Sequence, residues 1–275
     1  MIAFSAFFSP AVLYSPLLNA ELQFGDWRAS AAGCYLTGWR DLARPVTVEY
    51  VYDGDTARLA DGRKVRLLGI NTPELERDGR RVQPYAEVAR RSALNHLASG
   101  EEWYLLVGRE RRDRYGRWLG YLLNREGVAL GSMLIAEGSA FWVAQGEDIS
   151  HVSCFQEQES IARAERRGVW SSTYWQPLRA GELDRGTLGF RLVAGQVTKV
   201  EKTKSATYVE LDDHLVLRIS GRINAPVGGW PALMGRDLEV RGWVIWRKLT
   251  GKQTQKGFRS YMINLSSGHQ FKVVH

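Results

Sequence analysis

The stretch VTVEYVYDGDTARLADGRKVRLLGI, residues 46–70, decides the fold class of this chain. Val46–Tyr52 is rich in β-branched and aromatic residues, and Thr56–Ala60 and Lys64–Ile70 follow as shorter runs of the same kind, so each predicts a strand. Asp53-Gly54-Asp55 separates the first run from the second. Asp61-Gly62 separates the second from the third, which is typical of a tight hairpin turn. The stretch therefore predicts three consecutive strands joined by short turns.

The residues that follow predict a change from strand to helix and back again. Pro84–Leu97 has apolar residues at helical spacing, with a proline near its start and a glycine just beyond its end. Two further strands are predicted at Glu102–Val107 and Arg117–Leu123, and two further helices at Gly131–Glu137 and Phe155–Arg167. Five short strands with a helix after the third predict an OB-type five-stranded barrel. The fold is therefore expected to be mainly β, with inserted and C-terminal helices.

The last third of the chain predicts a second domain. Residues 171–186 contain Ser, Pro and Gly and are interpreted as a linker. The strand-like runs beyond it are Leu192–Val200, Tyr208–Leu211, Leu215–Ile219, Asp237–Trp246 and Ser260–Leu265. They predict a second small all-β domain, for which another OB-like barrel is one arrangement. The expected organisation is an N-terminal extension at residues 1–31, a barrel domain at 32–175 and an accessory domain at 186–275.

The N-terminal segment suggests export from the cell. Residues 1–20 contain no Asp, Glu, Lys or Arg, and Ala29-Ser30-Ala31 has the small-x-small form of a signal-peptide cleavage site. This predicts a periplasmic or secreted protein without a transmembrane span once mature; without such a signal the chain would be cytoplasmic. In an oxidising compartment Cys34 and Cys154 are expected to form a disulfide, whereas in the cytosol they would be two unrelated buried thiols.

Positive charge is concentrated in the accessory domain. The formal net charge of the chain is +7, and residues 185–275 hold 15 Lys and Arg against 6 Asp and Glu. A basic module beside a near-neutral one suggests a polyanionic partner, either nucleic acid or anionic lipid. A merely solubilising surface is the alternative. The composition implies no stable protein partner, and no Cys or His spacing typical of a structural zinc site occurs.

Three short motifs carry the residues that suggest chemistry. They are Asp53-Gly54-Asp55-Thr56, the run RLLGINTPE from Arg66 to Glu74, and Asp113-Arg114-Tyr115-Gly116-Arg117. Hydrolysis of a phosphodiester needs positive charge on the phosphate and a positioned water molecule. Arginine grips two phosphate oxygens at once, and carboxylate, amide and carbonyl oxygens bind hard divalent cations. Each motif alone could be an ordinary turn or surface strand.

Taken together and in this order, the three motifs resemble those of the thermonuclease family, also called staphylococcal-nuclease-like. The resemblance covers about residues 46–170 and includes the order of the helices. It implies a calcium-type nuclease that cleaves DNA or RNA and leaves 3′-phosphate ends. The catalytic positions that it implies are Arg66, Glu74 and Arg117. The implied metal-binding positions are Asp55, Asn71 and the Thr72 carbonyl, with Asp53 as an acidic neighbour in the same pocket.

Asn71 is a departure from the family pattern, which has Asp at this position. The amide removes one negative charge from the metal site, so we expect weaker binding of Ca²⁺, or of Mg²⁺ or Mn²⁺ in its place. The change leaves both arginines and Glu74 intact. The alternative function is a nucleic-acid-binding module of the same fold with a catalytically weakened site.

Further residues are candidates for substrate contacts. Tyr115 and Trp142 lie where the family places aromatic rings near the bound nucleotide, and stacking on such rings tolerates any base sequence. Many of the aromatic residues must instead form the core. In the accessory domain Arg247, Lys248 and Lys252 belong to a basic stretch with interleaved aromatics, which predicts a second contact with DNA or RNA. A solvated hairpin is the equally weighted alternative.

Overall fold

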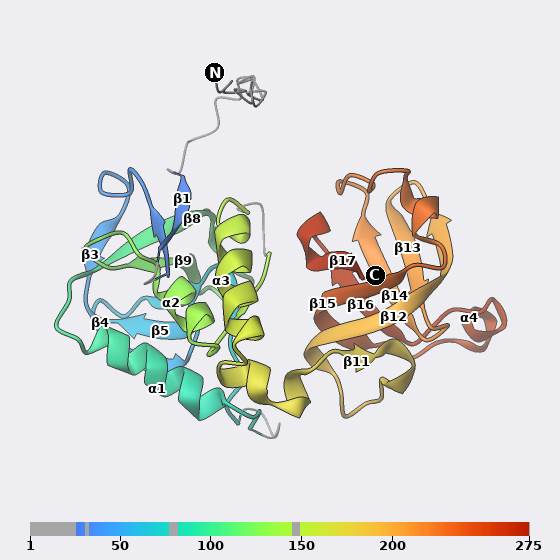
Figure 1. Ribbon diagram of the computed structural model, residues 1–275, viewed down its shortest axis with the longest axis horizontal. Helices are drawn as coiled ribbons and strands as arrows, with labels where there is room; N and C mark the ends of the chain where they lie inside the picture. Colours follow the sequence, from blue (N-terminus) through green and yellow to red (C-terminus); the bar gives the residue numbers. More distant parts are fainter. Residues whose placement is uncertain (1–25, 31–32, 77–81, 145–148, 275) are drawn as a thin grey trace, which may run out of the picture.

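The computed structural model describes residues 26–30, 33–76, 82–144 and 149–274, which form two β-rich lobes side by side (Figure 1). Most of the predicted export signal lies outside the described residues. Trp27–Ser30, however, forms strand β1 and pairs with β2 (Gly33–Leu36). The ring of Trp27 packs against Tyr121 and Phe155 of the first lobe. The folded domain therefore begins before the predicted boundary at residue 32.

The first lobe is a curled barrel, as predicted. Its six-stranded sheet has the order β3-β8-β9-β6-β5-β4. These strands are β3 (Arg44–Val46), β4 (Val48–Asp53), β5 (Thr56–Leu59), β6 (Lys64–Leu67), β8 (Trp103–Arg112) and β9 (Trp118–Leu123). Only Thr47 separates β3 from β4, so a nearly continuous stretch of chain pairs first with β8 and then with β5. This shared stretch brings the two ends of the sheet together, with β6 and β9 parallel.

Three helices cover the first barrel: α1 (Ala86–Leu97), α2 (Leu130–Ala136) and α3 (Val152–Ala164). A short two-stranded sheet of β7 (Ile70–Asn71) and β10 (Phe141–Trp142) lies beside α3. The predicted disulfide is confirmed, because Cys34 of β2 is bonded to Cys154 of α3 with Cα atoms 6.1 Å apart. None of the helices within the described ranges is long and apolar enough to cross a membrane.

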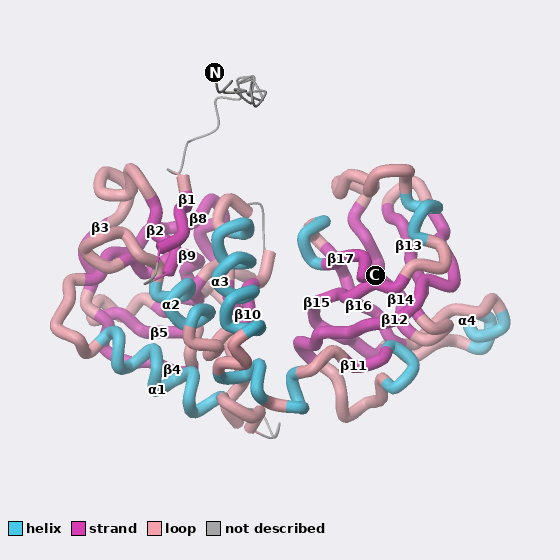
Figure 2. Tube along the Cα trace, in the orientation of Figure 1, coloured by secondary structure: helices cyan, strands magenta, loops and turns pink. Residues whose placement is uncertain are grey.

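The second lobe is a closed five-stranded barrel. Its strands are β12 (Gly189–Lys202), β13 (Ala206–Leu211), β14 (Leu215–Ser220), β15 (Asp237–Trp246) and β16 (Tyr261–Leu265). They pair in the order β12-β13-β14-β16-β15, and β15 pairs back with β12. As in the first lobe, the third and fifth strands are parallel. Two short edge strands, β11 (Leu178–Arg179) and β17 (Phe271–Val274), and the single turn of α4 (Gly251–Gln255) complete the lobe (Figure 2).

The predicted linker is in fact part of a packed interface between the lobes. It forms short 3-10 turns and β11, and Trp175 in it is only 2% exposed. Trp175 and Trp170 contact Phe141 of the first lobe, and Phe141 contacts Phe190 of the second. The Ser, Pro and Gly residues correctly indicated that this segment contains no long helix or strand. They did not indicate that Trp175, which lies among them, is buried.

Candidate active site

The hairpin between β4 and β5 places two carboxylates side by side inside the first barrel domain. Asp53 ends β4, and its Oδ1 accepts a hydrogen bond of 3.1 Å from the backbone N–H of Asp55. The two side chains are buried. Gly54 between them permits this packing, since a Cβ at that position would lie 2.6 Å from Cγ2 of Thr72. The turn therefore presses both carboxylates against the segment that follows β7.

Arg66 lies at the centre of the cluster, on β6. Its Nη2 lies 3.0 Å from Oδ2 of Asp55 and donates a hydrogen bond of 3.4 Å to Oδ1 of Asn71. Its Nη1 donates to the backbone carbonyls of Leu67 at 2.6 Å and Ile70 at 2.9 Å. Because Arg66 is buried and has four oxygen partners, its guanidinium is fixed in one orientation.

Asn71 and Thr72 contact the same cluster. The backbone N–H of Thr72 donates to Oδ2 of Asp55 at 3.0 Å. The side-chain amide of Asn71 donates to the Thr72 carbonyl at 3.2 Å. Gly69 precedes β7 with φ +79°, and a Cβ there would meet His151 at 2.7 Å and Phe155 at 2.8 Å. A glycine is thus required where the chain turns beneath α3 to deliver Asn71 to the site.

Arg117 reaches the same cluster through Thr56. Its Nη1 lies 3.5 Å from Oγ1 of Thr56, which in turn donates to Oδ1 of Asp55 at 3.0 Å. Its Nε pairs with Asp113 at 2.7 Å. Burial alone would raise the pKa of Asp113, but the hydrogen bonds and positive charge of Arg117 lower the pKa below its usual value. Thr56 was not among the predicted site residues, although it completes the first motif.

Tyr115 is 69% exposed beside this arginine. The guanidinium carbon of Arg117 lies 5.6 Å from the centre of its ring, and that of Arg114 lies 4.8 Å from it. An exposed ring flanked by two cations can accept a base on its free surface. Stacking of a base on Tyr115 remains a prediction, and the exposure of the ring is compatible with it.

Glu74 is exposed at the rim of the cluster. Its backbone N–H donates to Oε1 of Gln83 at 2.7 Å, which holds the segment after Pro73 against the start of the helical region. Its charge acts on Asp53. Burial first, and then the negative charges of Asp55 and Glu74, raise the pKa of Asp53 to about 7, against the lowering effect of Arg66. The pocket therefore holds more negative charge than Arg66 alone neutralises.

The oxygen atoms of this pocket fit a hard divalent cation in kind. Asp53, Asp55, the amide oxygen of Asn71 and the Thr72 carbonyl supply only oxygen donors, as Ca²⁺ and Mg²⁺ prefer. A cation here would relieve the repulsion that raises the pKa of Asp53. Within the described residues, no group of three or more His, Cys, Asp or Glu side chains has the arrangement of a metal site.

The structure corrects the predicted role of Trp142. Its indole is 4% exposed, and the guanidinium carbon of Arg241 lies 3.9 Å from the ring centre. A base cannot stack on a ring that is buried in this way. The sequence pattern could not exclude this, because Arg241 comes from the second barrel and is 99 residues away.

The predicted basic contacts of the second barrel lie on the loop between β15 and β16. Lys248 and Lys252 are exposed there, and Lys252 lies on α4, whose single turn begins with a capping box at Thr250. Arg247 is half-buried and donates to the carbonyl of Arg259 at 3.0 Å, so it supports the base of the loop. The two lysines are therefore the predicted residues that remain available to a polyanion.

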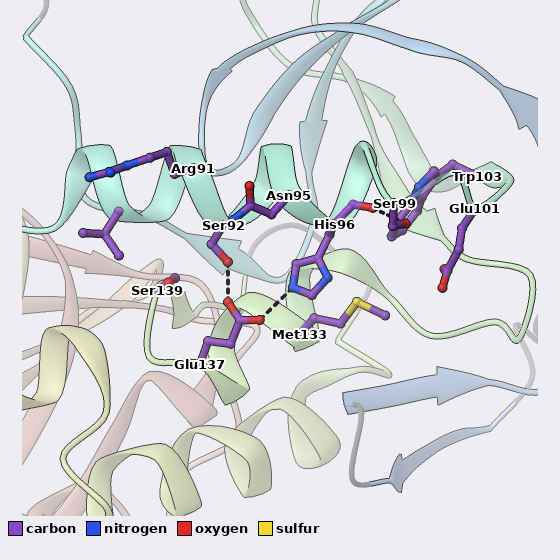
Figure 3. A pocket seen from close by; sticks show the side chains of 11 residues that line it. Arg91, Ser92, Asn95, His96, Ser99, Glu101, Trp103, Met133, Glu137 and Ser139 are labelled. Atoms are coloured by element: carbon purple, nitrogen blue, oxygen red, sulfur yellow. Dashed lines mark hydrogen bonds and ion pairs between the residues drawn. The ribbon is translucent and has the colours of Figure 1, made fainter.

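A separate cavity of about 670 Å³ opens between α1 and α2 and contains none of the predicted site residues (Figure 3). Glu137 lies at its centre, where it accepts hydrogen bonds from Ser92 and contacts Nε2 of His96 at 2.7 Å. The arginine–carboxylate cluster lies outside this cavity. We assign the chemistry to that cluster because its charged groups converge, and volume alone does not identify a reactive site.

Comparison with known proteins identifies the family to which the first lobe is similar. Residues 64–172 match the family model described as staphylococcal nuclease homologue. An uncharacterized endonuclease of Escherichia coli O157:H7 is 32% identical over 142 residues, which are 50% of this chain and 85% of that protein. Endonuclease YncB of Bacillus subtilis is 31% identical over 132 residues, covering 46% of this chain. A thermonuclease of Staphylococcus intermedius is 40% identical over 78 residues, covering 27% of this chain and 46% of that protein.

These matches cover only part of this chain and part of its relatives. The chain spans 62% of the length of YncB and 44% of that of the prophage-derived endonuclease YokF of the same organism. The family match ends at residue 172, before the second barrel begins. The family match covers the first lobe from β6 onward and includes the motifs at Arg66–Glu74 and Asp113–Arg117. On this evidence the chain belongs to the staphylococcal nuclease homologue family.

Proposed function

We propose that this protein is a metal-assisted nuclease that hydrolyses phosphodiester bonds of DNA, RNA or both and leaves 3′-phosphate ends. One observation carries the proposal: the guanidinium groups of Arg66 and Arg117 both converge on Asp55, one directly at 3.0 Å and one through Thr56. Two rigidly held cations beside a carboxylate cluster suit a phosphate that gains negative charge in the transition state. The endonuclease names of the relatives support the same reaction.

Each residue has a distinct role in this proposal. Arg117, at the rim beside the exposed ring of Tyr115, binds the phosphate of a nucleotide whose base stacks on that ring. Arg66, deeper in the pocket, orients Asp55 and Asn71 and adds positive charge behind the phosphate. Glu74 at the rim orients or deprotonates the attacking water. The proton that leaves the water is taken up by the Glu74 carboxylate.

The proposed cofactor is a divalent cation, with Ca²⁺ favoured over Mg²⁺ and Mn²⁺. Asp55, Asn71 and the Thr72 carbonyl would hold it, with Asp53 as a nearby charge. When bound, such an ion neutralises phosphate charge and lowers the pKa of a nearby water molecule. Because Asn71 is neutral, the affinity for the ion is expected to be low.

The test is cleavage of single- and double-stranded DNA and RNA with Ca²⁺, Mg²⁺, Mn²⁺ or EDTA. Asn71→Asp should lower the cation concentration that gives half-maximal cleavage, whereas Asn95→Asp on α1 should leave it unchanged. Asp55→Ala should nearly abolish metal-dependent cleavage. A wild-type rate that EDTA does not change would refute the metal mechanism.

A nucleic-acid-binding module is the second candidate function, and Asn71 is the observation that favours it. In that case the protein would bind single-stranded DNA in a filter or anisotropy assay but cleave no substrate with any metal. Retention of both arginines and Glu74 around one pocket argues for cleavage, because binding alone does not need a group that orients water.

We further propose that the exposed Lys248 and Lys252 add affinity for the polyanionic substrate and that the protein is exported. A disulfide between Cys34 and Cys154 suits a periplasmic or extracellular location, because cytosolic thiols are kept reduced. Trapping free thiols with an alkylating agent in intact cells tests the location. Quantitative labelling of both cysteines would contradict export.

A further inference from the structure

An ion pair between the two lobes reaches the edge of the candidate active site. Arg241 of β15 and Glu159 of α3 form a bidentate pair, with distances of 2.5 and 3.0 Å, and both side chains are buried. A second bidentate pair, Arg163 with Glu239, joins the same helix to the same strand at 2.7 and 3.0 Å. The two pairs look equivalent as clamps between the lobes, but they differ in what else they touch.

Only the first pair engages the backbone of β10. The N–H of Trp142 donates to Oε2 of Glu159 at 3.0 Å, and its carbonyl accepts from Nη1 of Arg241 at 2.9 Å. The N–H and C=O of one residue in a strand point to the same edge and those of the next residue point to the opposite edge, so the backbone groups of Phe141 and Val143 face β7 instead. Accordingly, the N–H of Val143 donates to the carbonyl of Gly69 at 2.8 Å. Arg241 and Glu159 thus satisfy the outer edge of β10 as a neighbouring strand would.

The inner edge of β10 leads directly to the catalytic candidates. Phe141 lies opposite Asn71 and Trp142 lies opposite Ile70 in the antiparallel pair with β7. The Ile70 carbonyl accepts a hydrogen bond from Arg66, and the Asn71 side chain contacts the same guanidinium. A continuous series of contacts therefore runs from Arg241 through Trp142 and β7 to Arg66.

We infer that Arg241 and Glu159 are positioning residues through which the second barrel holds β10 and β7, and thereby Arg66 and Asn71, in their reactive geometry. The second lobe is then a structural part of the active site as well as a surface for substrate. A two-residue strand such as β10 has too few hydrogen bonds to hold its place alone, which explains why it needs support on both edges. The expected effect on kcat rests on the proposed nuclease function, whereas the expected effect on hydrogen exchange in this part of the structure does not.

Hydrogen exchange tests the structural consequence without any need for activity. In Arg241→Met, the amides of Thr72 and Val143 should exchange at least ~10-fold faster than in the wild type. In the control Arg163→Met, which also loses a guanidinium between the lobes, although a half-buried one, both amides should keep their wild-type rates. Equal rates in the two variants, whether slow or fast, would overturn the inference. Should Arg241→Met fail to fold, Arg241→Lys keeps a charge but loses the bidentate geometry and should give a smaller acceleration of the same amides.

Kinetics separates positioning from simple stability. Glu159→Leu/Arg241→Met replaces both charges by apolar groups of similar size, which often restores stability lost by removing one partner. At a temperature where all proteins are folded, this double variant should still show kcat lowered ~10- to 100-fold with KM within ~3-fold of the wild type. Glu239→Leu/Arg163→Met should keep the wild-type kcat.

Recovery of kcat together with stability in the first double variant would show that the pair acts only as a clamp. A wild-type protein without activity would refute the proposed nuclease function. The inference on positioning would then be decided by the exchange rates of Thr72 and Val143 alone.

Discussion

The two lobes share one strand order but differ in what their loops carry. In both barrels the third and fifth strands are parallel and the first strand closes the sheet. The hairpin after the first strand contains Asp53 and Asp55 in the first lobe, but Thr203, Lys204 and Ser205 in the second. The same strand order therefore carries a carboxylate cluster on this hairpin in the first lobe and a loop with a single lysine in the second. The candidate site thus depends on the loops and not on the fold.

The third strands of the two barrels, β6 and β14, each carry an arginine, and the two arginines differ in their surroundings. Arg66 of β6 is buried and bonded to Asp55, whereas Arg218 of β14 is half-buried and lies opposite Tyr208 and Asn264. An arginine on the third strand thus becomes a candidate catalytic group only where the preceding hairpin supplies a carboxylate. The predictions below test this difference between the lobes, beginning with the largest expected effect.

The first lobe should depend on its disulfide, and the second should not. The Cys34–Cys154 bond spans 120 residues and ties β2 to α3. In the chain-entropy model, a loop of this size stabilises the folded state by ~4–5 kcal/mol. Cys34→Ser/Cys154→Ser should therefore lower the free energy of unfolding by about that amount in the first lobe.

Hydrogen exchange in rising urea, read separately for β8 with β9 and for β13 with β14, measures this loss in each lobe. The amides of the second barrel serve as the internal control. Equal losses in both lobes would show that the interface couples them into a single unfolding unit and would remove the distinction.

Substituting the two third-strand arginines should separate the lobes by activity. Arg66→Lys keeps a charge but cannot reproduce four oxygen contacts from one planar group, so kcat should fall about 10²- to 10³-fold. Arg218→Lys should stay within about 2-fold of the wild type. Steady-state cleavage of a short oligonucleotide at saturating cation measures both. A comparable loss in the two variants would place part of the reaction in the second barrel.

Neutralising the loop lysines should show how much the second lobe contributes to substrate binding. Lys248→Gln/Lys252→Gln removes two exposed charges, so KM for a long substrate should rise up to ~10-fold while kcat is unchanged. The slope of log affinity against log salt should fall by about 1.4 for single-stranded DNA.

The control for this prediction is Lys272→Gln on the same barrel. Lys272 pairs with Glu239 at 3.3 Å and faces the interface and not the loop. A change of KM as large as that of the loop variant would assign the effect to net charge and not to the position of the lysines.

The smallest expected effect concerns the ion pair between α1 and α2 in the first lobe. The hydrogen bond that His96 donates to Glu137 raises the pKa of His96 above 6.5. Burial would raise the pKa of Glu137, but His96 and Ser92 lower it below 4.5. The stability contributed by a histidine whose pKa is raised on folding is complete below pH 6.5 and is lost as the pH rises through the pKa of the folded state. The stability contributed by a carboxylate whose pKa is lowered on folding is lost as the pH falls below 4.5.

The pair should therefore stabilise the protein most between pH 4.5 and 6.5 and less at pH 8. Because both side chains are partly exposed, we expect a difference below ~1 kcal/mol between wild type and Glu137→Gln. Urea unfolding at pH 6 and pH 8 measures it. A larger difference at pH 8 than at pH 6 would contradict the assigned direction of the His96 shift.

Local sequence patterns determined the strands of both barrels and most of the candidate site. The alternation of β-branched residues and the Asp-Gly turns are short-range signals, so Val46–Tyr52 and Asp237–Trp246 were predicted close to their observed bounds. Arg66, Asp55 and Asn71 belong to motifs of a few residues around one hairpin. Their proximity follows from strand pairing, which such motifs specify.

Tertiary structure alone decided how the parts meet. Trp142 has the same local sequence whether its ring faces a nucleotide or a protein cation, and only the docking of β15 on α3 brings Arg241 over it. Trp175 lies in a segment that has the composition of a linker, yet it is buried because two lobes close around it. Contacts between residues about a hundred positions apart depend on the packing of whole lobes. A local sequence pattern cannot predict that packing, because it indicates only the conformation of its own few residues.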